Sequence, residues 1–133
     1  MKILKLFEKK INRLVIIHKT YGLEKTFLDN ILNPKIIPIF PEKGFFIFDI
    51  RIFFEFLKNL SNRKILLNFK NNFKFENINL NFYFNYIYLI YIYSLLNSYE
   101  TKLVLTTIDN SSFFYKLALI DKKRKYIAVQ NGI

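Results

Sequence analysis

Apolar and cationic residues alternate with helical spacing along the first 21 residues of the chain. The apolar positions recur at intervals of three and four residues: Ile3, Leu6, Phe7, Ile11, Leu14, Val15 and Ile17. Because this spacing gathers them on one face and leaves lysines on the others, it predicts a basic amphipathic helix that ends near Gly22. A short second helix is expected around residues 25–31, and Asn33-Pro34 ends it. We therefore expect residues 1–32 to form a basic N-terminal helical segment.

The next stretch predicts a strand, a helix and a second strand. Residues 33–44 hold all three prolines and predict an extended, turn-rich loop. Residues 45–50 read F-F-I-F-D-I, a continuous apolar run typical of a strand buried on both faces. Residues 51–60 repeat apolar positions at three and four residues and predict a short helix, and residues 64–69, K-I-L-L-N-F, predict a second buried strand. This order predicts a βαβ unit with parallel strands.

The second half of the chain predicts further strands. Residues 71–81 read as a loop that passes into a strand toward Phe84, and the tyrosine-rich run after Asn85 is compatible with a strand or a helix. Residues 101–108 and 116–120 are strand candidates with a polar turn between them.

Together these elements predict the α/β fold class. We expect a doubly wound core that is flavodoxin-like or Rossmann-like, with a mostly parallel sheet and flanking helices. This core covers residues 33–133, and with residues 1–32 it makes a single domain, as the length of 133 residues indicates.

The charge of the chain adds a class of partner. Its 21 Lys+Arg and 10 Asp+Glu give a formal net charge of +11, while 52% of the residues are hydrophobic, which is too many for a disordered basic tail. A polyanionic partner is the natural consequence. Zero Cys and one His exclude a disulfide framework, a thiolate metal site, a cysteine nucleophile and an imidazole cluster. We expect no cofactor and no metal.

The choice of residues also indicates the genome. Lys, Asn, Ile, Phe and Tyr, which AT-rich codons encode, are abundant, and Ala, Gly, Pro and Arg are scarce. This bias indicates an AT-rich genome such as that of an organelle. The many aromatic residues therefore say little about function.

Motifs for catalysis are absent from the sequence. The three glycines lie far apart, so neither nucleotide-binding glycine loop is present, and there is no G-x-S-x-G elbow. His18 lies on the predicted apolar helix and is interpreted as a packing residue. Asp49, Asp109 and Asp121 fall near predicted strand ends, where an acid is as often a helix cap or a lysine partner, so we assign them no chemistry.

One run of cations follows a predicted strand directly. The sequence Asp121-Lys122-Lys123-Arg124-Lys125 comes after residues 116–120 and would lie at the carboxyl end of that strand. Ligands of open α/β sheets bind at that edge, and a polyanion suits this run. A solvated turn is the alternative interpretation.

A membrane protein is the other class considered. Residues 81–96 carry no charge, but they include five Tyr and one internal Asn, and they are shorter than the roughly 20 apolar residues that a span needs. We expect no membrane span and no secretory signal. A membrane-associated organellar assembly subunit with residues 81–96 in the bilayer and a small basic enzyme remain as alternative functions.

Several segments resemble one known family. Residues 33–38, N-P-K-I-I-P, and 42–50, E-K-G-F-F-I-F-D-I, resemble the N-P-K-M-x-P and E-R-N-G-x-H-I-I-D-L signature of the universal small-subunit ribosomal protein "two" family. Residues 63–70 are similar to its G-K-I-L-F-V-G-T-K strand, residues 83–89 to its Y-V-N-H-R-W-L, and residues 117–129 to its L-F-V-I-D-P-x-K-E-x-I-A-V.

The chain also departs from the family pattern. The Arg, Trp and two Gly that follow the family's Asn are replaced by Ile87, Tyr88, Ile90 and Tyr91, so an RNA contact of that Arg is not carried over. There is no room for the family's helical hairpin, and relatives usually continue beyond residue 133. The resemblance thus implies a reduced version, with a separate chain as one way of completing the missing C-terminal part.

The resemblance implies a structural constituent of the small ribosomal subunit, located between head and body, that binds rRNA and neighbouring ribosomal proteins and is not an enzyme. With the codon bias, it implies a mitochondrial protein, another AT-rich organelle being the alternative. The candidate RNA contacts are Lys35, Lys43, Lys70, Lys122, Lys123, Arg124 and Lys125. Second choices on the first helix are Lys9, Lys10 and Arg13.

Overall fold

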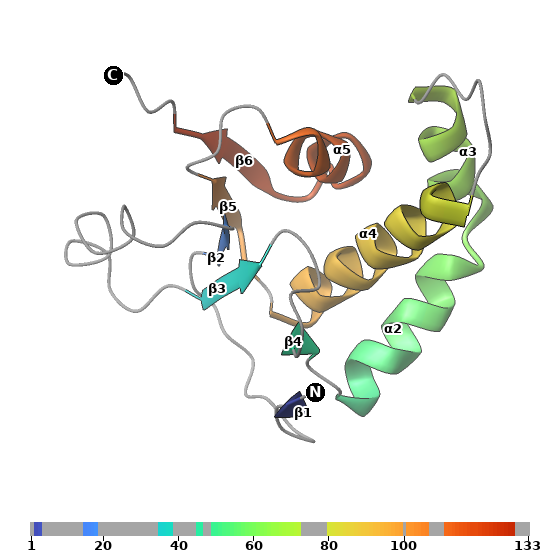
Figure 1. The fold of residues 1–133 in the computed structure, drawn as a ribbon, viewed down its shortest axis with the longest axis horizontal. Coiled ribbons are helices and arrows are strands. Elements are labelled where there is room, and N and C mark those ends of the chain that lie inside the picture. Colours follow the sequence, from blue (N-terminus) through green and yellow to red (C-terminus); the bar gives the residue numbers. More distant parts are fainter. Residues whose placement is uncertain are drawn as a thin grey trace.

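Parallel strands and packed helices form a mixed α/β structure (Figure 1). The structure is a computed structural model and describes residues 2–3, 15–18, 35–38, 45–46, 49–72, 80–99, 101–106 and 111–129. One sheet has the order β3-β2-β5-β6, with strands β3 (Lys35–Pro38), β2 (Val15–His18), β5 (Leu103–Thr106) and β6 (Lys125–Ala128). All neighbouring strands in it are parallel. A second parallel pair consists of β1 (Lys2–Ile3) and β4 (Phe45–Phe46). The described helices are α2 (Ile50–Leu60), α3 (Arg63–Asn72), α4 (Leu80–Tyr99) and α5 (Ser112–Ile120).

Helix α4 forms the centre of the core. It lies between α2 on one side and the sheet with α5 on the other (Figure 1). Its fully buried side chains include Leu89, Ile90, Ile92, Leu95 and Leu96. From Tyr88 onward α4 is covered on nearly all sides, and its sequence there shows no alternation of apolar and polar faces. The tyrosine-rich run is therefore a helix, and the strand predicted toward Phe84 is wrong, since α4 already begins at Leu80.

The hydropathy of α4 bears on the membrane alternative. Within the part of the chain that the structure describes, no helix combines the length and the apolar character needed to cross a membrane.

Helix α2 confirms the helix predicted for residues 51–60. Asp49 caps its N-terminus, where one carboxylate oxygen accepts a 2.8 Å hydrogen bond from the Arg51 backbone N–H. The Arg51 guanidinium pairs with the other oxygen at 2.7 Å. Of the strand predicted for residues 45–50, the described residues include the two-residue strand β4, Phe45–Phe46, while Asp49 is already the cap of α2 and Ile50 its first residue.

Helix α3 replaces a predicted strand. The run at residues 64–69 was expected to be a buried strand and is helical, so the prediction of a βαβ unit over residues 45–69 is wrong. Asn62 supports the helix start by accepting a 3.0 Å hydrogen bond from the Lys64 N–H. Leu, Lys and Arg favour helices, and Leu66 and Leu67 are exposed, which a strand buried on both faces would not allow.

Helix α5 replaces a second predicted strand, at residues 116–120. Its cap is Ser111, whose Oγ accepts a 3.3 Å hydrogen bond from the Phe114 N–H. Apolar side chains then recur one, four and seven residues after Phe113 and are buried, namely Phe114, Leu117 and Ile120. Strand β5 confirms a strand within residues 101–108. A βαβ unit does therefore occur, as β5, α5 and β6.

Strand β2 corrects the N-terminal prediction. Residues 15–18 were expected to belong to a basic amphipathic helix that ends near Gly22, but they form a strand between β3 and β5. The β-branched run Val15-Ile16-Ile17 explains this, because such side chains pack well on a pleated surface and lose rotamer freedom in a helix. The sequence before residue 33 thus supplies a strand to the same sheet as the sequence after it. Lys2–Ile3, at the start of the same predicted helix, form strand β1 instead. The other residues of that helix lie outside the described ones.

Strand β3 refines the prediction for residues 33–44. An extended loop was expected there. Within it, Lys35–Pro38 form a strand that is hydrogen-bonded in register with β2.

Candidate nucleic-acid interface

A buried ion pair fixes the corner where α5 ends and β6 begins. Asp121 follows α5 directly, and its N–H donates a 3.0 Å hydrogen bond to the Leu117 carbonyl. Its carboxylate pairs with the Arg124 guanidinium at 2.6 Å, and the two side chains are 0% and 5% exposed. Arg124 also donates to the Thr101 carbonyl at 3.0 Å and to the Asn97 side-chain oxygen at 2.9 Å. One guanidinium therefore joins the ends of α4 and α5 to the beginnings of β5 and β6.

Two more donors complete the hydrogen bonding of the Asp121 carboxylate. The Tyr126 hydroxyl donates to one oxygen at 2.7 Å, and the Lys123 backbone N–H donates to the other at 3.0 Å. Burial, with a further contribution from the neighbouring Asp121 carboxylate, raises the pKa of Tyr126 far above its usual value. The phenol therefore remains a donor, and the buried charge of Asp121 is fully hydrogen-bonded. The chain itself determines the shape of this turn before any ligand binds.

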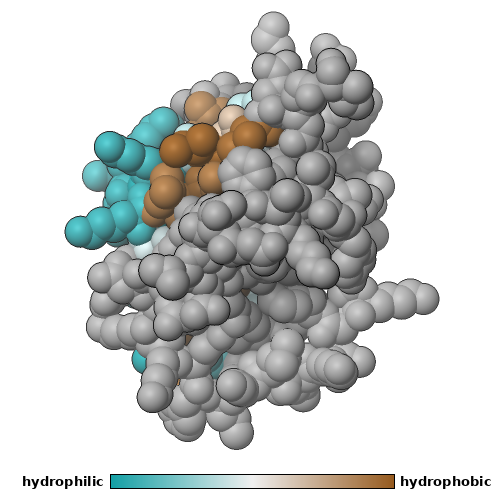
Figure 2. All heavy atoms as spheres, turned by 90° about the vertical axis from the view of Figure 1, so that its left-hand side faces the viewer, coloured by the Kyte–Doolittle hydropathy of each residue, from teal (hydrophilic) through white to brown (hydrophobic). Residues whose placement is uncertain are grey.

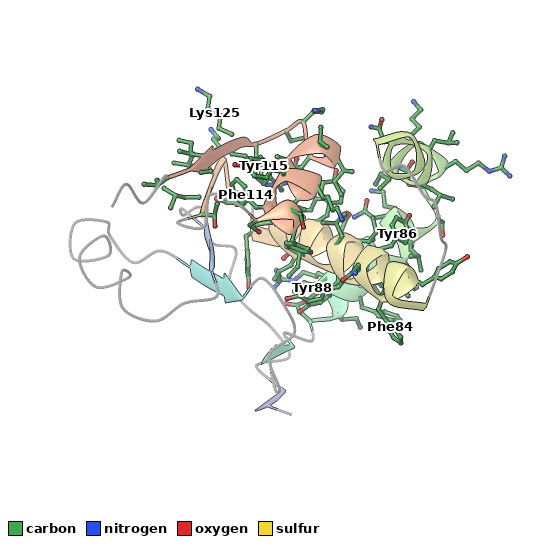
Figure 3. All side chains as sticks on the ribbon, turned by 45° about the horizontal axis from the view of Figure 1, so that its top comes forward. Phe84, Tyr86, Tyr88, Phe114, Tyr115 and Lys125 are labelled. Atoms are coloured by element: carbon green, nitrogen blue, oxygen red, sulfur yellow. The ribbon has the colours of Figure 1, made fainter. Side chains whose placement is uncertain are left out.

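The same turn displays lysines to solvent. Lys122, Lys123 and Lys125 are exposed, and so is Lys102, which precedes β5. The Lys125 N–H donates to the Lys102 carbonyl at 3.0 Å, so these two residues are neighbours at the start of β5 and β6. Figure 3 shows Lys125 projecting away from the helices. We call these four residues the lysine cluster.

The surface on this side of the molecule is mixed in character. Figure 2 shows hydrophilic residues gathered directly beside hydrophobic ones. Along β6 itself, Lys125 and Ile127 are both exposed. The described acid nearest in sequence, Asp121, is buried in its ion pair and presents no charge on this surface. An anionic ligand therefore meets cations and apolar contacts.

Two parts of the sequence-based site need correction. The cationic run was expected at the carboxyl end of a strand, but it lies at the amino end of β6, because the residues before it form α5 and those after it form the strand. Arg124 was expected to contact RNA, but its guanidinium points inward and holds Asp121, Thr101 and Asn97. We therefore replace it as a candidate by Lys102.

The sequence did carry a signal for Lys102. Parallel strands begin at the same edge of a sheet, so residues that precede two neighbouring strands come together. Lys102 directly precedes β5, which lies within the strand predicted for residues 101–108. The next strand was predicted at residues 116–120 instead of 125–128, so the starts of the two strands were not matched. Lys35 is the first residue of β3 and therefore lies at the same edge of the sheet, where its parallel strands begin. Because strands lie about 4.8 Å apart, it is roughly 14 Å from β6 along the sheet.

The remaining candidates stay predictions. Lys70 belongs to α3, and its side chain is not among those described. Lys43, Lys9, Lys10 and Arg13 lie outside the described residues. The structure therefore brings together Lys122, Lys123 and Lys125 and places Lys35 at the same sheet edge.

The other acidic residues singled out from the sequence have structural positions. Asp49 is the cap of α2, and Asp121 anchors the corner, while Asp109 lies outside the described residues. Among the described side chains, no group of three His, Asp or Glu is placed to hold a metal ion. Comparisons with protein-family models, with curated proteins and with solved structures gave no match to this chain.

Proposed function

We propose that this protein is a structural constituent of the small ribosomal subunit of a mitochondrion, and that its lysine cluster binds rRNA. The observation that carries the RNA contact is the lysine cluster on a corner held rigid by the Asp121–Arg124 ion pair. The ribosomal assignment is supported by the resemblance of residues 33–50 and 117–129 to the ribosomal protein "two" family. The net charge of +11 supports a polyanionic partner.

The binding mechanism is electrostatic. Each lysine that approaches a phosphate releases condensed counterions, and the entropy of this release drives association. Phosphate contacts of this kind follow the shape of the RNA backbone rather than its base sequence. If all four lysines of the cluster contact phosphates, log K should fall with log[salt] with a slope of about −3.

The proposed fold relationship is a reduced flavodoxin-like or Rossmann-like core without the family's helical hairpin. The parallel strands and the β5-α5-β6 unit support it. Helix α3 counts against the detailed correspondence, because it occupies residues where the family pattern has a strand. Neighbouring ribosomal proteins are the other proposed partners.

Fractionation of organelle lysates tests the proposal. We expect the protein to sediment with the small subunit at low salt and to leave it only at high salt. Its absence from small-subunit particles would overturn the ribosomal assignment. The alternative, a membrane-associated subunit with residues 81–96 in the bilayer, predicts instead that carbonate and high salt leave the protein in the membrane pellet.

A charge-matched pair of variants tests the RNA surface. The first replaces Lys122, Lys123 and Lys125 by Ala, and the control replaces Lys58, Arg63 and Lys64 by Ala, all of them exposed. Both lose three positive charges, so an unspecific effect of net charge is equal in the two. With a small-subunit rRNA fragment, we expect the salt slope to fall by about 2 to 3 in the first variant only. Equal slopes in the two variants would reject the lysine cluster as the binding surface.

A further inference from the structure

The outer side of α2 is unusually apolar for an exposed surface. Ile50, Phe53, Leu57 and Leu60 are all exposed, with Leu57 at 42%, and Phe54 beside them is 63% exposed. The side of α2 that is buried against α4 instead contains Ile52 and the polar Asn59. Five large apolar side chains of α2 therefore remain partly exposed, with accessible fractions from 36% to 63%.

The spacing of these residues is that of a helix-packing seam. Ile50 and Leu57 are seven residues apart, and Phe53 and Leu60 follow them by three, which is the a and d pattern of a heptad repeat. We call these four residues the α2 seam. A strict a/d stripe is narrow and suits the groove of a single partner helix better than a broad flat surface.

Within residues 49–72, the described stretch that holds α2 and α3, cations outnumber acids. The two acidic residues of this stretch are paired, Asp49 with Arg51 at 2.7 Å and Glu55 with Lys58 at 3.5 Å. Next to Leu60, the first turn of α3 carries Arg63 and Lys64, both exposed, and it contains no acidic residue. Cations are unfavourable at a helix N-terminus, where carboxylates are stabilised by the helix dipole. A carboxylate supplied by a partner would meet two cations and this dipole together.

We propose that the α2 seam and the first turn of α3 form a docking surface for an acidic amphipathic helix of a partner protein. The apolar seam supplies the packing surface, and Arg63 and Lys64 select acidic flanks. A second copy of this chain is disfavoured as the occupant, because each copy carries a net charge of +11. This docking surface is separate from the proposed RNA-binding surface, since it consists of residues of α2 and α3 and includes none of the lysine cluster.

Designed peptides provide the test. The first peptide is a helix of about three heptads with Leu at a and d and Glu at the flanking positions, and the second has Lys in place of Glu. Fluorescence anisotropy with the full chain should show binding of the Glu peptide at least about tenfold tighter than the Lys peptide. Ile50→Ser combined with Leu57→Ser should weaken the Glu peptide by about tenfold. The matched control, Leu119→Ser with Ile127→Ser, changes two exposed apolar residues elsewhere and should leave binding unchanged.

A charge reversal separates docking from folding. Arg63→Glu with Lys64→Glu improves the electrostatics of the α3 N-terminus, so the melting temperature should stay equal or rise. The same change should weaken binding of the Glu peptide and strengthen binding of the Lys peptide. No binding of the Glu peptide, or equal affinity for both peptides, would overturn the proposal.

Other occupants would give different results. A dimer that the seam variant converts to monomer assigns the surface to a second copy. Binding to phosphatidylglycerol vesicles that the seam variant abolishes assigns it to a lipid surface. Binding of poly(U) that the charge reversal abolishes while the seam variant leaves it intact assigns it to RNA. Each of these outcomes overturns the partner-helix proposal and leaves the sedimentation test of the ribosomal assignment untouched.

Discussion

Polar and apolar groups are distributed in opposite ways in two regions of the molecule, the corner between α5 and β6 and the outer side of α2. At the corner, a carboxylate and a guanidinium are buried and hydrogen-bonded within the chain, while lysines face solvent. On α2, Asn59 faces the core, where it donates a 2.9 Å hydrogen bond to Ser94, while Phe54 and Leu57 face solvent. The corner is complete within the chain, whereas the α2 seam leaves apolar surface that a partner could cover.

The difference has an energetic meaning. Full burial of a Leu, Ile or Phe side chain is worth roughly 1.5–3 kcal/mol, and the exposed side chains of the α2 seam obtain only part of it in the isolated protein. At the corner, the interactions form within the chain, so breaking them lowers the stability of the protein itself. Mutations at the two places should therefore affect different measurements, stability at the corner and association at α2.

The largest expected effect is at the corner. Asp121→Ala leaves the buried Arg124 guanidinium without its carboxylate, and it should lower the free energy of unfolding by about 3–5 kcal/mol. Urea denaturation followed by circular dichroism measures the change. Lys122→Ala is the matched control in the same turn, and its effect should lie within about 0.5 kcal/mol. A loss below about 1 kcal/mol for Asp121→Ala would contradict the view that this ion pair holds the corner.

Sequence reasoning correctly predicted one of the described helices, α2, from the spacing of its apolar residues. Helix α2 was predicted because its apolar residues recur at three and four, and Asp49 was correctly regarded as a possible cap. It failed for α4, whose burial on nearly all sides removes the periodic signal, so that a strand and a helix remained equally compatible.

Short apolar runs misled the prediction in three other places. Residues 64–69 and 116–120 were predicted to be strands because runs with only four apolar residues carry no decisive period. The caps Asn62 and Ser111 favour the helices that form there. The error at Val15–His18 was the reverse, because a helix was predicted and the β-branched residues form a strand. The strand was predicted at residues 116–120, before the cationic run, but it follows that run as β6. For this reason Lys102 was not recognised as a neighbour of the run, and Arg124 was expected to be exposed.

A smaller effect is expected at the polar contact that joins α2 to the core. Ser94 is buried and accepts the Asn59 amide while it donates to the Ile90 carbonyl at 2.8 Å. Ser94→Ala leaves the buried Asn59 donor unsatisfied, and it should cost about 1–3 kcal/mol. Amide hydrogen exchange should quicken in α2 and stay unchanged in β6, which would separate the two regions directly. Ser98→Ala, on the same helix but only partly buried, is the control, and equal effects of the two changes would contradict the proposed contact.

The smallest expected effect is a pH dependence located at the corner. Burial and the nearby Asp121 raise the pKa of Tyr126, so above pH 10 the unfolded chain loses this phenolic proton while the folded chain keeps it. The unfolded state then binds fewer protons, and the free energy of unfolding falls as the pH rises, by about 1.4 kcal/mol per pH unit for this group. Stability from Tyr126 is fully present below pH 10. Burial also raises the pKa of Tyr86, which adds to the same trend.

Tyr126→Phe isolates the contribution of the corner to this dependence. The variant loses the hydrogen bond to Asp121, so it should be less stable at pH 8, but its stability should fall less steeply between pH 10 and 11 than that of the unchanged protein. Tyr115→Phe, at an exposed position, should leave the slope as it is. Denaturation curves at each pH, with tyrosinate absorbance as the second signal, give both quantities. A slope that Tyr126→Phe leaves unchanged would show that the phenol ionises equally in both states, and the corner would then not be the closed, water-excluding network that distinguishes it from α2.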